Sequence, residues 1–316
     1  MQLTRRTLLI GAAALIATPG WASATRILGG RAFASTWRAV LPADADAQAA
    51  AALVAHIVAE TDAAMSPWRA DSEVSRFNRS ASLDWSPASA NLCAVVDEAE
   101  RLRALTSGAF DARVGPLVAR YGFGPIRDGV PAGDAVVREG ELRKTATALT
   151  LDLCGIAKGH ALDRIVRALA DAGLDTALVE LGGEVHALGS HPEGRPWQIA
   201  VERPGASVSA QRIVAPGRLA LATSGHVAQG HAGRAPLTHI IDPRSAHPAD
   251  QALLSVSVLA PTAMRADALA TALAAAGPVA GPVMARDLGL SALFLRRASG
   301  EIVETMTGDF AAHVTG

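Results

Sequence analysis

The chain is predicted to have an α+β fold, in which mixed or antiparallel sheets carry packed helices. It has 316 residues, half of them hydrophobic and 19% charged, which is enough apolar material for one large core or two intimately associated halves. Short apolar stretches follow one another through the second half of the chain, as in a series of strands, while helical patterns are grouped elsewhere. This grouping favours α+β over strict alternation of strands and helices.

Composition excludes several classes of function. The net charge of −1 gives no basic face for nucleic acid, and aromatic residues, at 4%, are too few for base-stacking platforms. Cys93 and Cys154 are the two cysteines, and the apolar context of each predicts buried free thiols rather than a disulfide.

Residues 1–24 are predicted to be a cleaved export signal. Thr4-Arg5-Arg6-Thr7 precedes the apolar run Leu8 to Ala17, and Ala22-Ser23-Ala24 offers a small-residue cleavage site. The paired arginines suit the twin-arginine route, with an ordinary secretory signal as the alternative. Either signal predicts a periplasmic protein whose single domain is residues 25–316. The run is too short for a permanent membrane span, and no nearby cysteine indicates a lipid anchor.

Apolar residues at helical spacing predict four helices, with Ser89 and Thr262 as caps of two of them. The polar stretch Asp71–Asn78 is predicted to be a loop or a single turn. The four helices are Asp44–Met65, Ser89–Leu105, the segment that follows Ala157, and Pro261–Gly277.

Short apolar runs between turn residues predict the strands, and Gly182-Gly183 predicts a hairpin between two of them. The predicted strands are Arg26–Val40, Thr147–Leu153, Thr176–Leu181, Glu184–Leu188, Trp197–Glu202, Arg218–Thr223, Thr238–Asp242, Leu253–Ala260, Leu290–Arg296 and Glu301–Thr305.

The segment Leu151–Asp163 runs from an apolar strand end through a glycine turn into the first turn of a helix. Such a junction directs free backbone N–H groups and the positive end of the helix dipole at one spot, where an anion can bind. Lys158 stands in that first turn and is one of only two lysines, with Lys144, in an arginine-rich chain. Its ammonium group either binds the anion or is solvated on the surface of the helix.

Few side chains suggest chemistry by themselves. Asp267 and Thr271, one helical turn apart, suit a hard cation such as Mg²⁺, although the spacing also arises by chance. His239, beside two isoleucines, is either a structural residue or a base. Ser224 could contact phosphate or cap a turn, and Asp111 could bind a polar ring edge or cap a turn. The known phosphate loops, zinc spacings and nucleophile elbows are absent from the sequence, so these residues leave the ligand open.

Seven segments, in order along the chain, together resemble the ApbE family of FAD:protein FMN transferases. The resemblance covers nearly the whole chain after the signal. The segments are Met65-Ser66 with Ser72-Glu73 through Asn78, Ser107–Asp111 with Gly115-Pro116-Leu117, Asp152–Asp163, Glu180–Glu184, Thr223-Ser224-Gly225, His239–Arg244 and Ala266–Thr271.

The resemblance implies an ApbE-like fold that binds FAD with its pyrophosphate beside Mg²⁺. It assigns the metal to the Ala157 carbonyl, Asp267 and Thr271, and the catalytic base to His239. The implied reaction moves FMN from FAD onto a threonine or serine hydroxyl of an acceptor flavoprotein and releases AMP. The implied FAD contacts are Met65, Ala109, Phe110, Asp111, Lys158, His160, Ser224 and Ile241.

The chain departs from the family pattern at three places. Phe33-Ala34-Ser35 stands where the family usually has Met-Gly-Thr, Cys154 replaces a glycine, and Ala246 replaces another. None removes a proposed ligand or the base. They are compatible with a specialised branch, such as exported relatives that serve nitrous oxide respiration.

Two other functions stay open at this level. The same site could cleave FAD to FMN and AMP with water as the acceptor, as a Mg²⁺-dependent pyrophosphatase. Alternatively, the protein could be a non-catalytic periplasmic FAD-binding or flavin-donor accessory protein.

Overall fold

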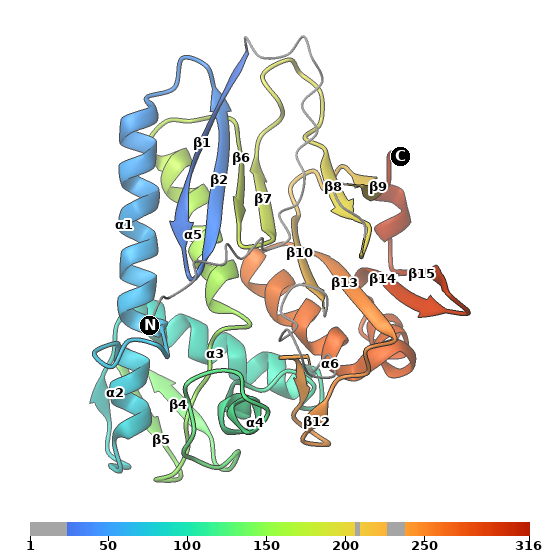
Figure 1. Cartoon of the computed structure of the whole chain (residues 1–316). Coiled ribbons are helices and arrows are strands. Elements are labelled where there is room, and N and C mark those ends of the chain that lie inside the picture. Colours follow the sequence, from blue (N-terminus) through green and yellow to red (C-terminus); the bar gives the residue numbers. More distant parts are fainter. Residues whose placement is uncertain (1–23, 206–208, 226–237) are drawn as a thin grey trace, which may run out of the picture.

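An antiparallel sheet of eight strands forms the centre of the molecule and confirms the predicted α+β class (Figure 1). The computed structural model describes residues 24–205, 209–225 and 238–316, so nearly all of the predicted export signal lies outside the described residues. The strands, in spatial order, are β1 (Thr25–Ala32), β2 (Ser35–Pro42), β6 (Ala177–Leu181), β7 (Glu184–Leu188), β10 (Ala220–Gly225), β13 (Leu253–Ala260), β14 (Ser291–Ala298) and β15 (Glu301–Thr307).

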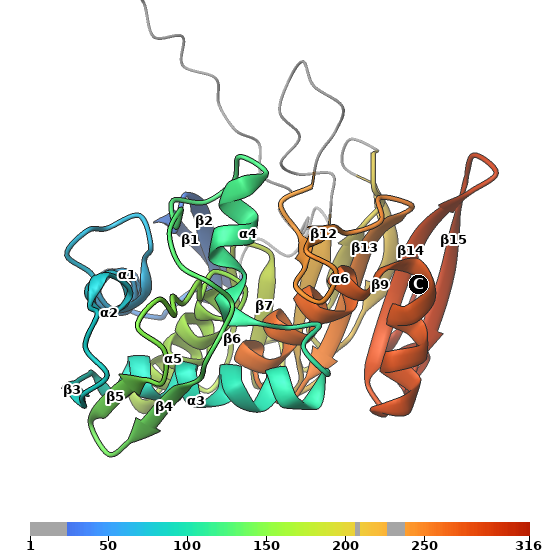
Figure 2. The ribbon, with the colours of Figure 1, turned by 90° about the horizontal axis from the view of Figure 1, so that it is seen from below.

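The central strands of this sheet pack against a hydrophobic core on each face, because successive side chains of a strand point to opposite faces. On β10, Ala220 and Ala222 belong to the larger hydrophobic core on the helical face, whereas Leu221 belongs to a second core on the other face. Helices α5 and α6 cover the first face. Residues of the β8–β9 hairpin and of a C-terminal 3-10 helix pack on the second. The view from below shows β9 on the side of the sheet opposite α6 (Figure 2).

The described part of the chain contains six α-helices. The predicted caps are confirmed, because the Ser89 and Thr262 hydroxyls accept hydrogen bonds from backbone N–H groups three residues on. The helices are α1 (Ala47–Met65), α2 (Glu73–Arg79), α3 (Ala90–Leu105), α4 (Gly115–Arg120), α5 (Ala157–Asp171) and α6 (Ala263–Asp287), with 3-10 helices at Ala112–Val114 and Phe310–His313.

Three small sheets complete the described fold, in the strand orders β3-β5-β4, β8-β9 and β11-β12. Their strands are β3 (Ser86–Pro87), β4 (Ala135–Arg138), β5 (Glu141–Lys144), β8 (Ile199–Glu202), β9 (Ala210–Val214), β11 (Ile241–Asp242) and β12 (His247–Pro248).

The predicted single strand Arg26–Val40 is wrong, because the segment is a hairpin. Phe33 and Ala34 form its turn with φ of 50° and 60°, in the left-handed region that glycine usually occupies. Gly29 and Gly30 do not form the turn but lie inside β1. Gly30 makes room for Trp37 on β2, because a Cβ on Gly30 would lie 2.6 Å from Trp37 Nε1. The turn was missed because its residues carry no turn signal.

The predicted strand Thr147–Leu153 is also wrong, although Leu149, Leu151 and Leu153 are all buried. Side chains take the place of a neighbouring strand. The Asn78 amide donates to the Leu151 carbonyl at 2.9 Å and accepts from the Leu151 N–H at 2.8 Å. Lys144 donates to the Leu149 carbonyl at 2.9 Å. The segment is therefore extended but belongs to no sheet.

Three other boundaries differ from the prediction. The polar stretch near Asp71 forms helix α2, because the Ser72 hydroxyl caps it. The predicted strand Thr238–Asp242 reduces to the two residues of β11. Helix α6 runs past Gly277, where φ of 83° makes a kink from which Pro278 starts a new helical stretch. Among the described residues, α6 is the only helix long and apolar enough to cross a membrane, and most of that stretch is buried in the core.

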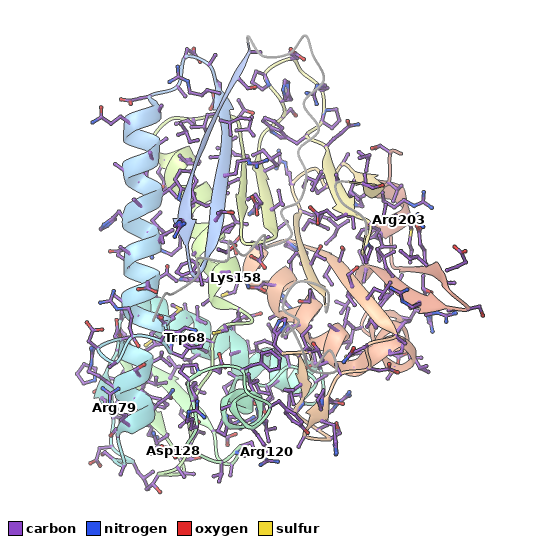
Figure 3. The ribbon with its side chains drawn as sticks, viewed as in Figure 1. Trp68, Arg79, Arg120, Asp128, Lys158 and Arg203 are labelled. Carbon is purple, nitrogen blue, oxygen red and sulfur yellow. The ribbon has the colours of Figure 1, made fainter. Side chains whose placement is uncertain are left out.

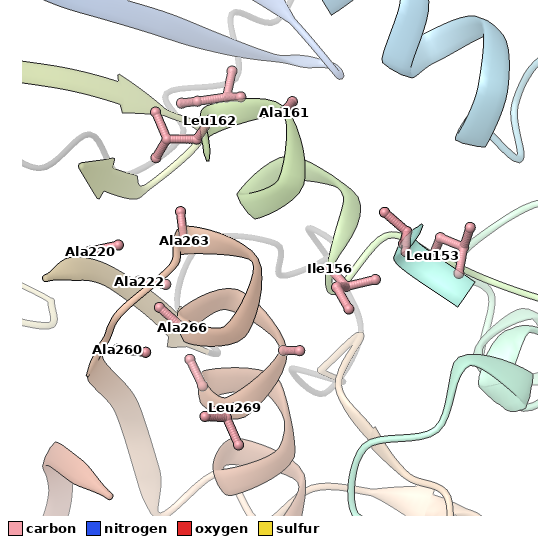
Figure 4. Packing of buried hydrophobic residues seen from close by; sticks show 14 of the residues in the cluster. Leu153, Ile156, Ala161, Leu162, Ala220, Ala222, Ala260, Ala263, Ala266 and Leu269 are labelled. Atoms are coloured by element: carbon pink, nitrogen blue, oxygen red, sulfur yellow. The ribbon is translucent and has the colours of Figure 1, made fainter. Parts of the chain in front are cut away.

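Small residues bring α5 and α6 together (Figure 4). A Cβ on Gly159 would lie 2.7 Å from the Met264 Cα, so only glycine allows this crossing. The Asp163 carboxylate of α5 accepts hydrogen bonds from the Ala263 and Met264 N–H groups, at 2.7 and 2.9 Å. This contact caps α6 and holds its start against the middle of α5.

Candidate active site

A cavity of about 880 Å³ lies where α5 and α6 meet β7 and β10. Most of the residues predicted for the site line it, although they come from segments far apart in the sequence. These lining residues are Ala109, Phe110, Asp111, Lys158, Ser224, His239, Ile241, Asp267 and Thr271.

Lys158, labelled in Figure 3, stands in the first turn of α5. It reaches carboxylates from two other elements. Its Nζ lies 3.2 Å from Asp267 Oδ1 on α6 and 3.2 Å from Glu184 Oε1 on β7. Both carboxylate side chains are only 3% exposed. Burial alone would lower the pKa of Lys158, but Asp267 and Glu184 raise it above its ordinary value, so the ammonium stays charged. Of the two readings of Lys158, the solvated surface residue is therefore wrong.

Asp267 and Thr271 both face the cavity from α6. Asp267 Oδ2 accepts the Gly159 N–H at 3.1 Å, and Thr271 Oγ1 lies 3.3 Å from Ser224 Oγ on β10. A Cβ on Gly155 would lie 3.2 Å from Thr271 Oγ1, so the turn before α5 approaches this hydroxyl closely. Hydroxyl and carboxylate oxygens from α6 and β10 therefore converge on one wall, beside the first turn of α5.

Asp111 and His239 line the cavity from two different loops. Asp111 Oδ1 accepts hydrogen bonds from the Arg113 backbone N–H at 2.9 Å and from Arg113 Nε at 2.8 Å. The His239 ring packs edge-on against Phe123, with 6.2 Å between ring centroids. Asp111 is thereby held in one orientation, and His239 is supported by an aromatic neighbour.

Three predicted site residues do not line the cavity. Met65, at the end of α1, is buried in the hydrophobic core. Ala157 is the first residue of α5, so its carbonyl faces along the helix within the hydrogen-bond ladder. The imidazole of His160 contacts Asn91 Oδ1 at 3.3 Å, and burial lowers the pKa of His160 to about 4. Their roles toward FAD or a metal stay predictions.

Several lining residues were missing from the predicted site. Glu184 follows the Gly182-Gly183 turn and lines the cavity. A carboxylate next to a glycine turn between two apolar strands is the sequence feature that could have indicated its role. Asp152 Oδ1 accepts the Cys154 N–H at 3.0 Å and so shapes the turn before α5. Trp68 lines the cavity with 70% of its surface exposed.

The prediction of two buried thiols is half wrong. Both cysteines are free, but only Cys93 is buried, whereas Cys154 is exposed and lines the cavity. The apolar neighbours of Cys154 are buried in the core on the other side of the turn, which leaves its side chain toward the cavity. Desolvation nevertheless raises the pKa of the Cys154 thiol well above its ordinary value.

No group of three or more His, Cys, Asp or Glu side chains in the described ranges is arranged to hold a metal ion. A metal at Asp267 would therefore need hydroxyl, backbone or substrate oxygens as further ligands.

Known proteins resemble the chain along most of its length. The family model described as the ApbE family matches residues 33–294. An FAD:protein FMN transferase of Vibrio cholerae is 36% identical over 253 residues, which are 75% of this chain and 76% of that protein. One from Escherichia coli K12 is 31% identical over 92% of this chain and 89% of its own.

Solved structures agree with this match. The flavin transferase ApbE from Vibrio cholerae superposes with a TM-score of 0.79 at 33% identity, over 92% of this chain and 99% of that one. The flavinyl transferase ApbE of Pseudomonas stutzeri gives a TM-score of 0.79 at 30% identity, over 92% of this chain and 96% of that one. The chain belongs to the ApbE family.

Proposed function

We propose that this protein is an FAD:protein FMN transferase, which moves FMN from FAD onto a threonine or serine hydroxyl of an acceptor flavoprotein. The observation that carries this proposal is the cavity at the α5–α6 crossing, which joins a helix N-terminus, an ammonium and hydroxyls in a member of this family. Its relatives bear the name of this activity.

Different residues of the cavity would contact different parts of FAD. The first turn of α5 would bind the pyrophosphate, because the positive end of the helix dipole and the Lys158 ammonium both lie there. Asp267 and Glu184 already pair with that ammonium and hold it in place. The Ala109–Asp111 segment and Ile241 supply an apolar wall with one carboxylate. Ser224 adds a hydroxyl on β10 beside Thr271. An elongated ligand with a charged centre and flat ends suits this arrangement.

In the proposed reaction, His239 accepts the proton of the acceptor hydroxyl. The hydroxyl oxygen then bonds to the FMN phosphorus, and the bond from that phosphorus to the bridging oxygen of the pyrophosphate breaks. The electron pair of the broken bond leaves with AMP. Lys158 stabilises the negative charge that develops on the phosphate oxygens.

Mg²⁺ fits the residues of this wall. Asp267 and Thr271 are hard oxygen donors one helical turn apart, and Mg²⁺ is commonly bound through one or two carboxylates together with phosphate oxygens and water. A cation, the Lys158 ammonium, is already the partner of Asp267. When bound, Mg²⁺ would neutralise pyrophosphate charge and make AMP a better leaving group.

The test is incubation with FAD, Mg²⁺ and a candidate acceptor, followed by mass measurement of the acceptor. We expect a mass increase of one FMN on the acceptor and AMP in solution. His239→Ala should abolish transfer while FAD still binds, because the imidazole moves a proton rather than holding the flavin. Normal transfer by that variant would contradict the assignment of the base.

The same experiment separates the two other functions. Release of AMP at a comparable rate without any acceptor would identify a pyrophosphatase that uses water. Tight FAD binding with no AMP under either condition would identify a flavin-binding accessory protein.

We also propose that the protein is exported to the periplasm and has no stable membrane anchor. The arginine pair Arg5-Arg6 before an apolar run supports the twin-arginine route. Substitution of both arginines by lysine should leave the precursor in the cytoplasm, as detected by fractionation. Export that is unaffected would favour the ordinary secretory route.

A further inference from the structure

Three ionisable side chains meet at the cavity wall, one amine and two carboxyl groups. Lys158 supplies one positive charge, while Asp267 and Glu184 supply two carboxylates, each only 3% exposed. The ammonium lies at the same distance, 3.2 Å, from the nearest oxygen of each carboxylate. One ammonium is thus shared between two buried carboxyl groups.

The two carboxylates differ in their other partners. Asp267 also accepts the Gly159 N–H, at 3.1 Å. Among the described residues, Glu184 Oε2 is buried with no hydrogen-bond partner. Glu184 therefore has unused acceptor capacity for the ammonium, whereas Asp267 has another donor in place.

A divalent cation and the Lys158 ammonium would compete for Asp267. If Lys158 simply left Asp267, a buried ammonium would lose a partner, which is costly. Glu184 removes this cost because it lies within reach of the same ammonium. After the shift, Lys158 and Glu184 form a neutral pair, and the charge of Asp267 is available to the metal.

We propose that Glu184 is a positioning residue that holds the Lys158 ammonium away from Asp267 when a divalent cation binds there. The inference rests on the proposed function, since it takes the metal position from it. It adds a role for a carboxylate that is not itself a metal ligand.

The test is a titration of the full protein with Mn²⁺ in the absence of FAD, with free Mn²⁺ followed by electron paramagnetic resonance. Lys158→Met should tighten Mn²⁺ binding, because the competitor for Asp267 is gone. Glu184→Gln should weaken it about tenfold, because Lys158 then has only Asp267 as a charged partner.

The double variant Lys158→Met with Glu184→Gln decides how Glu184 acts. If Glu184 acts through Lys158, the double variant should bind Mn²⁺ as Lys158→Met does. Glu180→Gln is the matched control: Glu180 is a buried carboxylate at the other side of the same hairpin, its Oε1 accepts the Gly183 N–H, and it does not line the cavity. It should leave Mn²⁺ affinity unchanged, and circular dichroism checks that each variant is folded.

Three results would overturn the proposal. An equal loss of affinity from Glu184→Gln with and without Lys158 would make Glu184 a direct ligand. Unchanged or weaker binding by Lys158→Met would show that the ammonium does not compete. If neither the wild type nor Lys158→Met binds Mn²⁺, there is no cation site at Asp267. Because FAD and an acceptor are absent, failure of the transferase reaction leaves this result unaffected.

Discussion

His160 illustrates how one residue at the edge of the site couples to pH. It stands in the first turn of α5, and burial lowers the pKa of His160 to about 4, against about 6.5 for an unfolded histidine. Between these values the unfolded chain binds more protons than the folded one. Stability therefore rises with pH across this window and falls as pH drops toward the folded-state pKa.

We expect the free energy of unfolding to drop by about 2 kcal/mol through this residue between about pH 7 and about pH 5. Urea denaturation of the wild type and His160→Gln at both pH values measures it. The glutamine amide does not titrate and can still donate to Asn91, so the variant should lose less stability on acidification. Equal losses in both proteins would contradict the assignment.

At the scale of the element, the extended segment that leads to the site depends on Asn78. This amide makes both backbone hydrogen bonds of buried Leu151, a task that a neighbouring strand performs elsewhere in the fold. Asn78→Ala should lower stability by about 2–4 kcal/mol, since it leaves a buried N–H and a buried carbonyl unpaired. FAD affinity should fall as well, because the segment continues into Asp152 and the turn before α5.

Urea denaturation and an FAD titration at a temperature where the variant is folded measure these two effects. Asn91→Ala is the control. The Asn91 side chain contacts His160 and makes no hydrogen bond to the extended segment in the described structure. This substitution should cost less than Asn78→Ala. A change within about 0.5 kcal/mol for Asn78→Ala would refute this view of the segment.

The crossing of α5 and α6 depends on Gly159. In an open helix, Gly→Ala stabilises by about 1 kcal/mol, because alanine has the higher helix propensity. Here the added Cβ would meet the backbone of Ala263 and Met264, so we expect Gly159→Ala to destabilise by about 1–3 kcal/mol. Thermal or urea unfolding gives the sign directly, and a more stable variant would show that the helices are not in this contact.

At the scale of the whole molecule, FAD would touch both helices of the crossing, β10 and two loops. A ligand that binds only the folded protein stabilises it by about 2.7 kcal/mol at a hundredfold excess over its Kd. FAD with Mg²⁺ should therefore raise the unfolding temperature by several degrees. Calorimetry with FAD, with FAD plus a chelator and with AMP alone measures the shift, which should be largest for FAD with metal. No shift at saturating FAD would contradict the placement of the ligand in this cavity.

Local patterns in the sequence were sufficient for most helices, their caps and the strands of the central sheet. The Gly182-Gly183 hairpin and the caps Ser89 and Thr262 were predictable because they depend on backbone geometry within a few residues. The hairpin turn at Phe33-Ala34 was not, since its left-handed backbone is held by the pairing of β1 with β2 rather than by residue type. Leu149–Leu153 has the alternation of a strand, but pairing depends on what lies beside it.

Patterns along the chain predict the α+β class, the helix stripes and, through motifs in family order, nine of the residues that line the cavity. They do not reveal that Lys158 bridges Asp267 and Glu184, that Cys154 faces the cavity or that His160 contacts Asn91. The physical reason is distance along the chain. A cap or a stripe is set by neighbours a few residues away, whereas a shared ammonium depends on how α5, β7 and α6 pack together.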